Sequence, residues 1–221
     1  MMTSFVDGTK SMIEMACLSN ATGLVPDVRG MHGPRIDIKD IVSTFRLKSD
    51  GGILEKEGVV DFVIGDLAPG VFLVYSTKNR LVRDLISYLN LGSGPNYLIY
   101  KPYHFTSLET PLSLARAYFD RQPWIVPMDG GLVSEVVAIA KRDLKPGVDI
   151  DGIGGFTVYG LIELYDTAKK ENLLPISLSQ GCILRSAKKK GETLTFADVE
   201  FPEDTLLIQL RKLQDKVIQK R

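Results

Sequence analysis

Lys101 and His104 are two side chains that can donate or accept protons, and they follow closely on an apolar stretch of the chain. An ammonium group can stabilise an oxygen that gains negative charge during hydride transfer, and imidazole titrates near neutral pH. Both residues are therefore candidate catalytic groups. Simpler roles are a strand-edge lysine that discourages aggregation and a turn histidine bonded to backbone. Glu109, further along, can complete a capping box with Thr106.

Asp7, Lys10 and Glu14 form a second group, spaced three and four residues apart. This spacing places them on one side of a helix that we predict from about residue 10 to residue 20, ending at Gly23. Lys10 is a third candidate catalytic residue, with Glu14 holding it in place and Asp7 capping the helix. The methionine and alanine content predicts a largely buried helix, in which a lysine–carboxylate pair needs a functional reason. The alternative is an ordinary exposed surface pair.

The elements around Lys101 and His104 are predicted from local composition. Residues 96–105 are aromatic and aliphatic, which is typical of a strand in a covered sheet. Thr110 is predicted to be the N-cap of the following helix, because Pro111 suits a first helical position. A phosphate or carboxylate of a substrate could rest on that helix start at Thr110.

The remaining pattern predicts helices and strands in an α+β arrangement. Residues 59–64 and 70–75 are expected to be neighbouring strands joined by a Pro69–Gly70 turn. Further helices are expected at 38–45, 79–91 and 165–173, and the region after about residue 127 has short strands and frequent turns. An amphipathic helix in the tail, 204–221, has Leu206, Leu210, Leu213 and Val217 on one side and could pack on its own domain or on a partner.

Composition argues against several classes of function. Lys plus Arg (27) equal Asp plus Glu (27), so no net charge favours nucleic acid or an acidic membrane surface. No apolar run is long enough to span a membrane, and no leader peptide is visible at Met1. Cys17 and Cys182 are far apart, as expected of reduced core thiols in a cytoplasmic protein. With two histidines and no paired cysteines, no metal site is predicted.

Two glycine clusters do not match nucleotide-binding loops. The motif that begins Gly152-x-Gly154 has Thr157 where a third glycine is required. The segment from Gly155 to Gly160 continues into Leu161 instead of the Lys-Ser/Thr of a phosphate loop. Both clusters are better explained as tight turns.

Three segments of this sequence occur together in a known group of enzymes. They are SFVDGTK at 4–10 with IEM at 13–15 and NATGL at 20–24, YLIYKPYHF at 97–105, and AKRDLKPG at 140–147 with DGIGG at 151–155. The chain resembles the C-terminal half of homoserine-dehydrogenase-like NAD(P)-dependent oxidoreductases that carry a SAF domain. This group includes reductoisomerase-like enzymes that act on 1-deoxyxylulose 5-phosphate. The long Asp- and Lys-containing signature of homoserine dehydrogenases proper is not found, which argues against homoserine as the substrate.

The resemblance implies a mixed-sheet catalytic and dimerisation domain over residues 1–125 and a small β-rich SAF (β-clip) domain over 127–221. It implies a small sugar-derived hydroxy or keto substrate bound near Asp7, Asn20 and Thr110, and a homodimer. It also implies NAD(P) as cofactor, although the Rossmann domain that holds it in such enzymes is not in this sequence. We therefore expect the isolated chain to be inactive, and a separate Rossmann polypeptide is a candidate partner.

A non-enzymatic role is the main alternative. In it, the SAF part recognises a sugar acid or a partner protein through two similar basic turns, 141–145 and 188–190.

Overall fold

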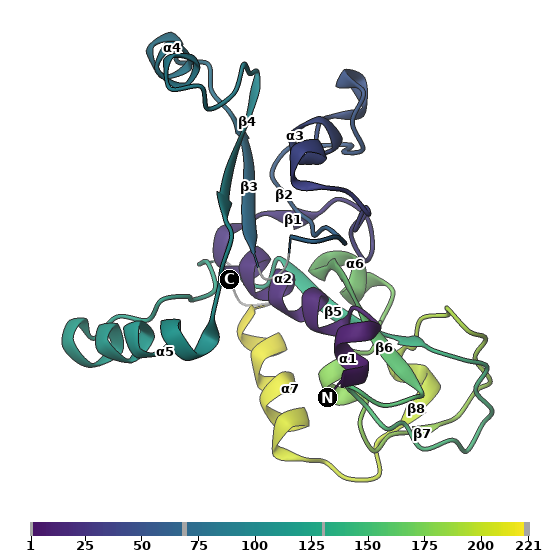
Figure 1. The fold of residues 1–221 in the computed structure, drawn as a ribbon. Coiled ribbons are helices and arrows are strands. Elements are labelled where there is room, and N and C mark those ends of the chain that lie inside the picture. Colours follow the sequence, from purple (N-terminus) through teal and green to yellow (C-terminus); the bar gives the residue numbers. More distant parts are fainter. Residues whose placement is uncertain (1, 68–69, 130, 219–221) are drawn as a thin grey trace. The chain divides into compact units, whose positions relative to one another are not determined.

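The computed structural model describes residues 2–67, 70–129 and 131–218, and it contains helices and small sheets, consistent with an α+β protein (Figure 1). Contacts divide the chain into two compact units. Unit 1 comprises Met1–Met31, Gly58–Asp61 and Val126–Arg221, and unit 2 comprises His32–Glu57 and Phe62–Ile125. The predicted domains 1–125 and 127–221 group the chain differently, because the first helices lie in unit 1 with the C-terminal part.

The centre of unit 1 is an antiparallel pair of strands, β5 (Ser134–Ala140) and β6 (Val158–Leu164), in register from Ser134–Leu164 to Ala140–Val158. Most β5 side chains are buried, since both of its faces are covered. Val137 and Ile139 pack with Ala168 and Leu173 in the core.

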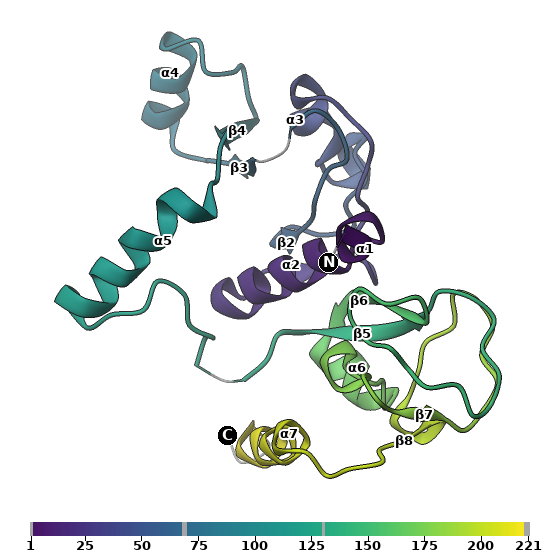
Figure 2. The ribbon, with the colours of Figure 1, turned by 60° about the horizontal axis from the view of Figure 1, so that its bottom comes forward.

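The helix α2 (Thr9–Thr22) lies against β6 and β5 (Figures 1 and 2). It confirms the predicted helix and its end at Gly23, which has a φ of 78°. The Gly160 N–H donates to the fully buried Thr9 Oγ1 at 2.9 Å. A Cβ at residue 160 would lie 2.6 Å from a Val136 methyl and 3.2 Å from the Thr9 methyl, so glycine permits the close approach.

Only one face of α2 is buried. Met12, Ala16 and Ser19 are covered, whereas Lys10, Glu14 and Cys17 are exposed. The expectation of a largely buried helix was wrong, because the buried positions recur at helical spacing and leave the charged side in solvent.

Shorter elements complete unit 1. Among them, α6 (Tyr165–Lys170) confirms the helix that was predicted for residues 165–173. The elements are α1 (Met2–Val6), β1 (Val25–Pro26) paired in parallel with β2 (Val59–Val60), α6 (Tyr165–Lys170), η4 (Ile176–Leu178), β7 (Ile183–Leu184), η5 (Phe196–Asp198), β8 (Val199–Glu200) and α7 (Leu206–Ile218). The two basic turns are neighbours, since Leu144 and Lys188 exchange backbone hydrogen bonds of 2.8 and 3.0 Å.

Unit 2 is built on a two-stranded antiparallel ribbon of β3 (Val71–Ser76) and β4 (Asn96–Lys101). The predicted pairing of strands 59–64 and 70–75 was wrong, because β3 pairs with β4 and β2 pairs with β1. An antiparallel return through the intervening helix satisfies the backbone of both ribbon strands. Of the predicted Pro69–Gly70 turn, Pro69 lies outside the described residues.

One face of the ribbon is covered, and the other is covered only at the end that carries Tyr75 and Tyr97. The Phe72 ring lies 5.4 Å from the Phe45 ring on the covered face. On the opposite face Val71, Leu73 and Ile99 are about half exposed, so the expectation of a covered sheet was wrong for this face.

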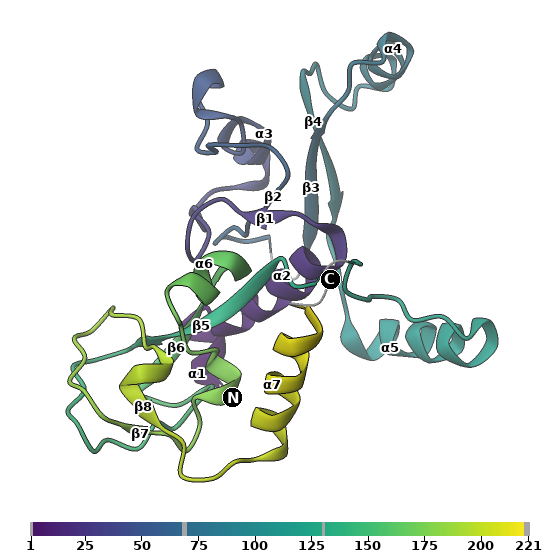
Figure 3. The ribbon, with the colours of Figure 1, turned by 180° about the vertical axis from the view of Figure 1, so that it is seen from behind.

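Helices flank the ribbon. The first, α4 (Arg80–Tyr88), is capped by the Asn79 side chain, which accepts from the N–H groups of Leu81 and Val82. It lies at one end of the ribbon and α5 (Thr106–Ala115) at the other (Figures 1 and 3). The remaining helical segments of the unit are η1 (Ile38–Asp40), α3 (Ile41–Thr44), η2 (Lys48–Asp50) and the π-helix η3 (Arg116–Asp120).

Candidate functional site

Asp7 lies just before α2, where a nearly buried ion pair holds its carboxylate. Its Oδ2 is 2.5 Å from Lys141 Nζ, and the two side chains are 14% and 15% exposed. Asp7 Oδ1 accepts from the Thr9 N–H at 2.9 Å, which satisfies one N–H of the first turn as the capping role requires. Burial alone would raise the pKa of Asp7, but hydrogen bonds from Lys141 and Thr9 outweigh it and lower the pKa.

Two residues near Asp7, Lys141 and Tyr159, were not among the catalytic candidates predicted from the sequence. Lys141 Nζ also donates to the Gly155 carbonyl at 2.5 Å, which fixes the ammonium between two elements. Burial and the charge of Asp7 raise the pKa of the Tyr159 hydroxyl. Nothing in the sequence pairs residue 7 with residue 141, because the contact depends on α2 docking against β6.

Lys10 and Glu14 face each other on α2, as their spacing predicts. Nζ and Oε1 are 4.0 Å apart, and both side chains are 48% exposed. The Lys10 ammonium also lies 4.0 Å from the centre of the Phe5 ring. This geometry is that of a surface pair, which contributes a few tenths of a kcal/mol and leaves the ammonium accessible to a ligand.

The side chain of Asn20 forms three hydrogen bonds within the fold. Its Oδ1 accepts from the N–H groups of Val133 (2.6 Å) and Ser134 (3.1 Å), and its Nδ2 donates to the Ser134 carbonyl at 3.1 Å. The amide therefore clamps the end of α2 to the start of β5. This arrangement leaves it little capacity for a substrate.

Lys101 and His104 belong to unit 2, at the end of β4 and in the segment that follows it. Lys101 Nζ forms a close ion pair with Glu109 of α5, and both side chains are partly exposed. His104 is half-buried. Glu109 thus binds Lys101, an alternative to the capping-box role considered from the sequence.

Thr110 does not begin a helix. The helix starts at Thr106, and Thr110 Oγ1 donates to the Thr106 carbonyl at 2.6 Å. The predicted N-cap was wrong because the chain is already helical before Pro111, which lies inside α5. A substrate anion therefore finds no free first-turn N–H groups at Thr110.

The two cysteines differ in burial. Cys182 is buried, and burial raises the pKa of its thiol to about 11, whereas Cys17 is exposed and was wrongly expected in the core.

Within residues 2–67, 70–129 and 131–218, no group of three His, Cys, Asp or Glu side chains could hold a metal ion. None of the helices in these ranges is long and apolar enough to cross a bilayer.

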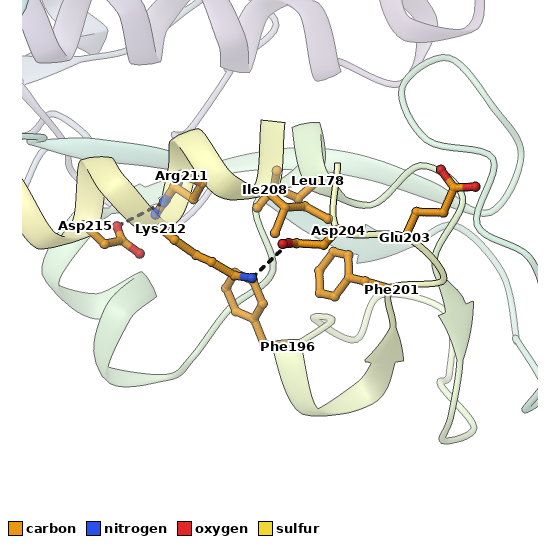
Figure 4. A pocket seen from close by; sticks show the side chains of 9 residues that line it. All are labelled: Leu178, Phe196, Phe201, Glu203, Asp204, Ile208, Arg211, Lys212 and Asp215. Atoms are coloured by element: carbon orange, nitrogen blue, oxygen red, sulfur yellow. Dashed lines mark hydrogen bonds and ion pairs between the residues drawn. The ribbon is translucent and has the colours of Figure 1, made fainter. Parts of the chain in front are cut away.

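A cavity of about 320 Å³ lies in unit 1 between α7 and the β-rich part (Figure 4). Apolar side chains of Leu178, Phe196, Phe201 and Ile208 line it together with charged ones. Lys212 and Asp204 pair across it at 2.9 Å. None of the predicted site residues contributes to its wall.

The N-terminal half of the chain matches a family model. Residues 1–110 match the model described as oxidoreductase DRL, catalytic domain. The match supports an oxidoreductase catalytic domain. The segment matched to the DRL domain includes every residue predicted for the site, with Thr110 as its last residue, whereas Lys141 and Tyr159 lie beyond it. No curated protein is similar enough to the chain to count as a match.

Proposed function

We propose that this chain is the catalytic part of an NAD(P)-dependent oxidoreductase or reductoisomerase that acts on a small sugar-derived hydroxy or keto substrate. The observation that carries the proposal is the DRL catalytic-domain match over residues 1–110. The matched segment holds all three candidate proton-transfer residues, Lys10, Lys101 and His104.

Each of these residues has a role that its surroundings support. Lys10 lies beside Glu14 and Lys101 beside Glu109, and the partial exposure of both lysines leaves N–H donors for a substrate oxygen. His104 is half-buried, and its imidazole can both donate and accept a proton. Lys101 and His104, which belong to the same unit, would stabilise negative charge on the substrate oxygen and return its proton. Asp7 keeps its capping role at the start of α2.

The cofactor of the proposed reaction is NAD(P), which would supply or accept the hydride. The glycine turn at 152–155 does not fit a dinucleotide phosphate. The Asp151 carboxylate fills it and accepts from the N–H groups of Phe156 (2.5 Å) and Thr157 (3.0 Å). A phosphate would have to displace this carboxylate and would be repelled by it. We therefore expect NADPH to be held by residues outside this sequence.

Calorimetry with NADPH tests this expectation. The isolated chain should show no heat of binding at micromolar concentrations and no oxidation of NADPH with any substrate. Micromolar binding would contradict it and would place the cofactor site within these residues.

Substrate binding tests the proposed function itself. We would titrate the chain with a panel of small hydroxy and keto sugar phosphates and follow binding by calorimetry. One class should bind, and Lys101→Ala or His104→Ala, both in unit 2, should weaken its binding about tenfold, the loss expected for one charged hydrogen bond. Lys39→Ala, an exposed lysine on a short helix, is the matched control and should leave binding unchanged. Failure of the whole panel, or equal binding by all variants, would contradict the proposal.

The alternative of a binding module is less well supported. It requires the basic turns to offer free cations. However, three of the six basic side chains in these turns are paired, Lys141 with Asp7, Lys188 with Asp198 at 2.7 Å, and Lys189 with Asp143 at 3.1 Å. The other three, Arg142, Lys145 and Lys190, form no ion pair with a described residue. The three pairs compete with an acidic ligand, so the oxidoreductase remains the better proposal.

A further inference from the structure

The C-terminal helix α7 packs on unit 1 through its charged face. Ile208, Arg211, Asp215 and Ile218 recur at spacings of three and four residues and are the partly buried positions of the helix. In Figure 4, Ile208 lies beside Leu178, and Arg211 is joined to Asp215. Two isoleucines and two charged side chains therefore face the body of the protein.

Ion pairs hold this face in place. The Arg211 guanidinium binds Glu135 of β5 closely and Asp215 Oδ1 at 3.0 Å. Asp215 also accepts from the Tyr165 hydroxyl at 3.1 Å and from Lys169 Nζ at 2.9 Å. The cavity of Figure 4 lies beneath the same helix, so apolar packing under α7 is incomplete. The orientation of α7 is thus set by a hydrogen-bonded charge network.

The opposite side of α7 is a row of apolar side chains in solvent. We define the leucine stripe as Leu206, Leu210, Leu213 and Val217, which are 69%, 52%, 57% and 50% exposed. Their spacing of four, three and four residues is that of a coiled-coil seam. Because Arg211 and Asp215 face inward and the leucine stripe faces solvent, the helix leaves apolar surface that a partner helix would cover.

We propose that the leucine stripe packs against the leucine stripe of a second copy of this chain, with the two helices antiparallel. An antiparallel alignment centred between Leu210 and Leu213 brings each of these residues next to the other in the second copy. It also aligns Leu206 with Val217. The stripe is therefore complementary to itself, as a two-fold interface requires.

Charge supports a second copy and the antiparallel direction. The positions flanking the stripe are Leu207, Gln209, Gln214 and Lys216. They carry a single charge, so nothing calls for a strongly charged partner of opposite sign. Parallel helices would place the two Lys216 ammonium groups side by side, whereas antiparallel helices place them at opposite ends. The helix dipoles also favour the antiparallel pair.

The size of the surface sets the strength of association. The helix has 13 residues and is therefore about 20 Å long, two heptads of seam. Such a contact is smaller than the roughly 1,200 Å² that a stable interface buries. We therefore expect a reversible association that depends on concentration. The inference goes beyond the proposed function, because it involves neither the substrate nor the catalytic candidates.

Sedimentation equilibrium of the full chain tests the proposal over low micromolar to several hundred micromolar protein. The wild type should show a rising mass, and Leu210→Glu/Leu213→Glu should weaken this association more than about tenfold, because carboxylates would be buried in the seam. Leu81→Glu/Leu85→Glu makes the same change at two exposed leucines of α4, away from the stripe, and should associate nearly as the wild type does. Because Glu is a good helix former and the stripe is exposed, both variants should keep the wild-type circular dichroism and melting temperature.

A disulfide variant fixes the direction. In a Cys17→Ser background, Leu210→Cys/Leu213→Cys should form mainly bonds between residue 210 of one copy and residue 213 of the other. Association that persists unchanged in Leu210→Glu/Leu213→Glu would overturn the proposal. So would a wild type of constant mass, or crosslinks that join only identical positions. Because none of these measurements uses a substrate, failure here and failure of the proposed function are distinguishable.

Discussion

At the scale of single residues, Asn20 illustrates why a plausible ligand can be a structural clamp. Its amide satisfies the backbone of residues 133 and 134, which begin β5. The resemblance places it near the substrate, whereas its three hydrogen bonds link it to a strand more than a hundred residues away. Only the folded chain brings these atoms together, so the clamp could not be predicted from local sequence patterns.

We predict that Asn20→Ala lowers the free energy of unfolding by about 1–3 kcal/mol, since partly buried N–H and C=O groups would lose their partner. Urea denaturation measures the change. Asn96→Ala is the control, because within the described part of the chain its side chain makes no hydrogen bond, and it should change stability by much less. A stable Asn20→Ala protein that loses substrate binding would instead indicate a ligand role.

Asp198 gives a prediction for pH. Burial alone would raise its pKa, but hydrogen bonds from Lys188, Ser186 and Thr195 outweigh it and lower the pKa from 3.8 to about 2. The unfolded carboxylate therefore takes up its proton at a higher pH than the folded one. The stability from this group is complete above about pH 4 and is lost as pH falls towards about 2.

Urea denaturation of wild type and Asp198→Asn across this range tests the prediction. The variant should be less stable at neutral pH and should lose less stability between about pH 4 and pH 2. Because other paired carboxylates such as Asp7 also titrate there, the difference between the two proteins is the quantity to compare. Parallel curves would show that Asp198 does not contribute.

At the scale of elements, local sequence patterns predicted most helices. They failed where the structure depends on residues far away in the sequence, as in strand pairing. Gly23 marked the end of α2, and Asn79 marked the start of α4, because caps depend on neighbouring residues. The pairing of β3 with β4 could not be predicted, since an apolar strand accepts any neighbour that satisfies its backbone. The predicted start at Thr110 failed because a proline in first position and a proline inside a helix look alike in sequence.

Pro111→Ala tests that correction. Inside α5, proline removes one hydrogen bond and crowds the preceding turn, which costs about 3 kcal/mol in a regular helix. The substitution should therefore increase helix content by circular dichroism and stabilise unit 2. Ser113→Ala, exposed on the same helix, should change both by much less. If the helix began at Thr110, Pro111→Ala would have no effect.

At the scale of the whole molecule, the open part of one ribbon face supports a second contact between copies, separate from the leucine stripe. Val71, Leu73 and Ile99 are exposed side by side, and two-stranded ribbons are seldom stable alone. We predict a dimer through this face and test it in the Leu210→Glu/Leu213→Glu background, so that the leucine stripe does not contribute. In that background, Leu73→Lys/Ile99→Lys should lower the mass from that of a dimer to that of a monomer in light scattering. Ser76→Lys, on the opposite face, is the control and should leave the dimer intact. A monomeric wild type at high concentration would count against a dimer through this face.

Unit 1 is assembled from three separate stretches of the chain, the first at the N-terminus and the last beginning at Val126. During synthesis, α2 leaves the ribosome long before β6, the strand whose Gly160 N–H binds Thr9. The side of α2 that is buried in the folded protein therefore stays exposed until β6 has been made, and chaperones could bind it during that time. A gene fragment that stops at codon 125 would yield a product in which this docking never happens.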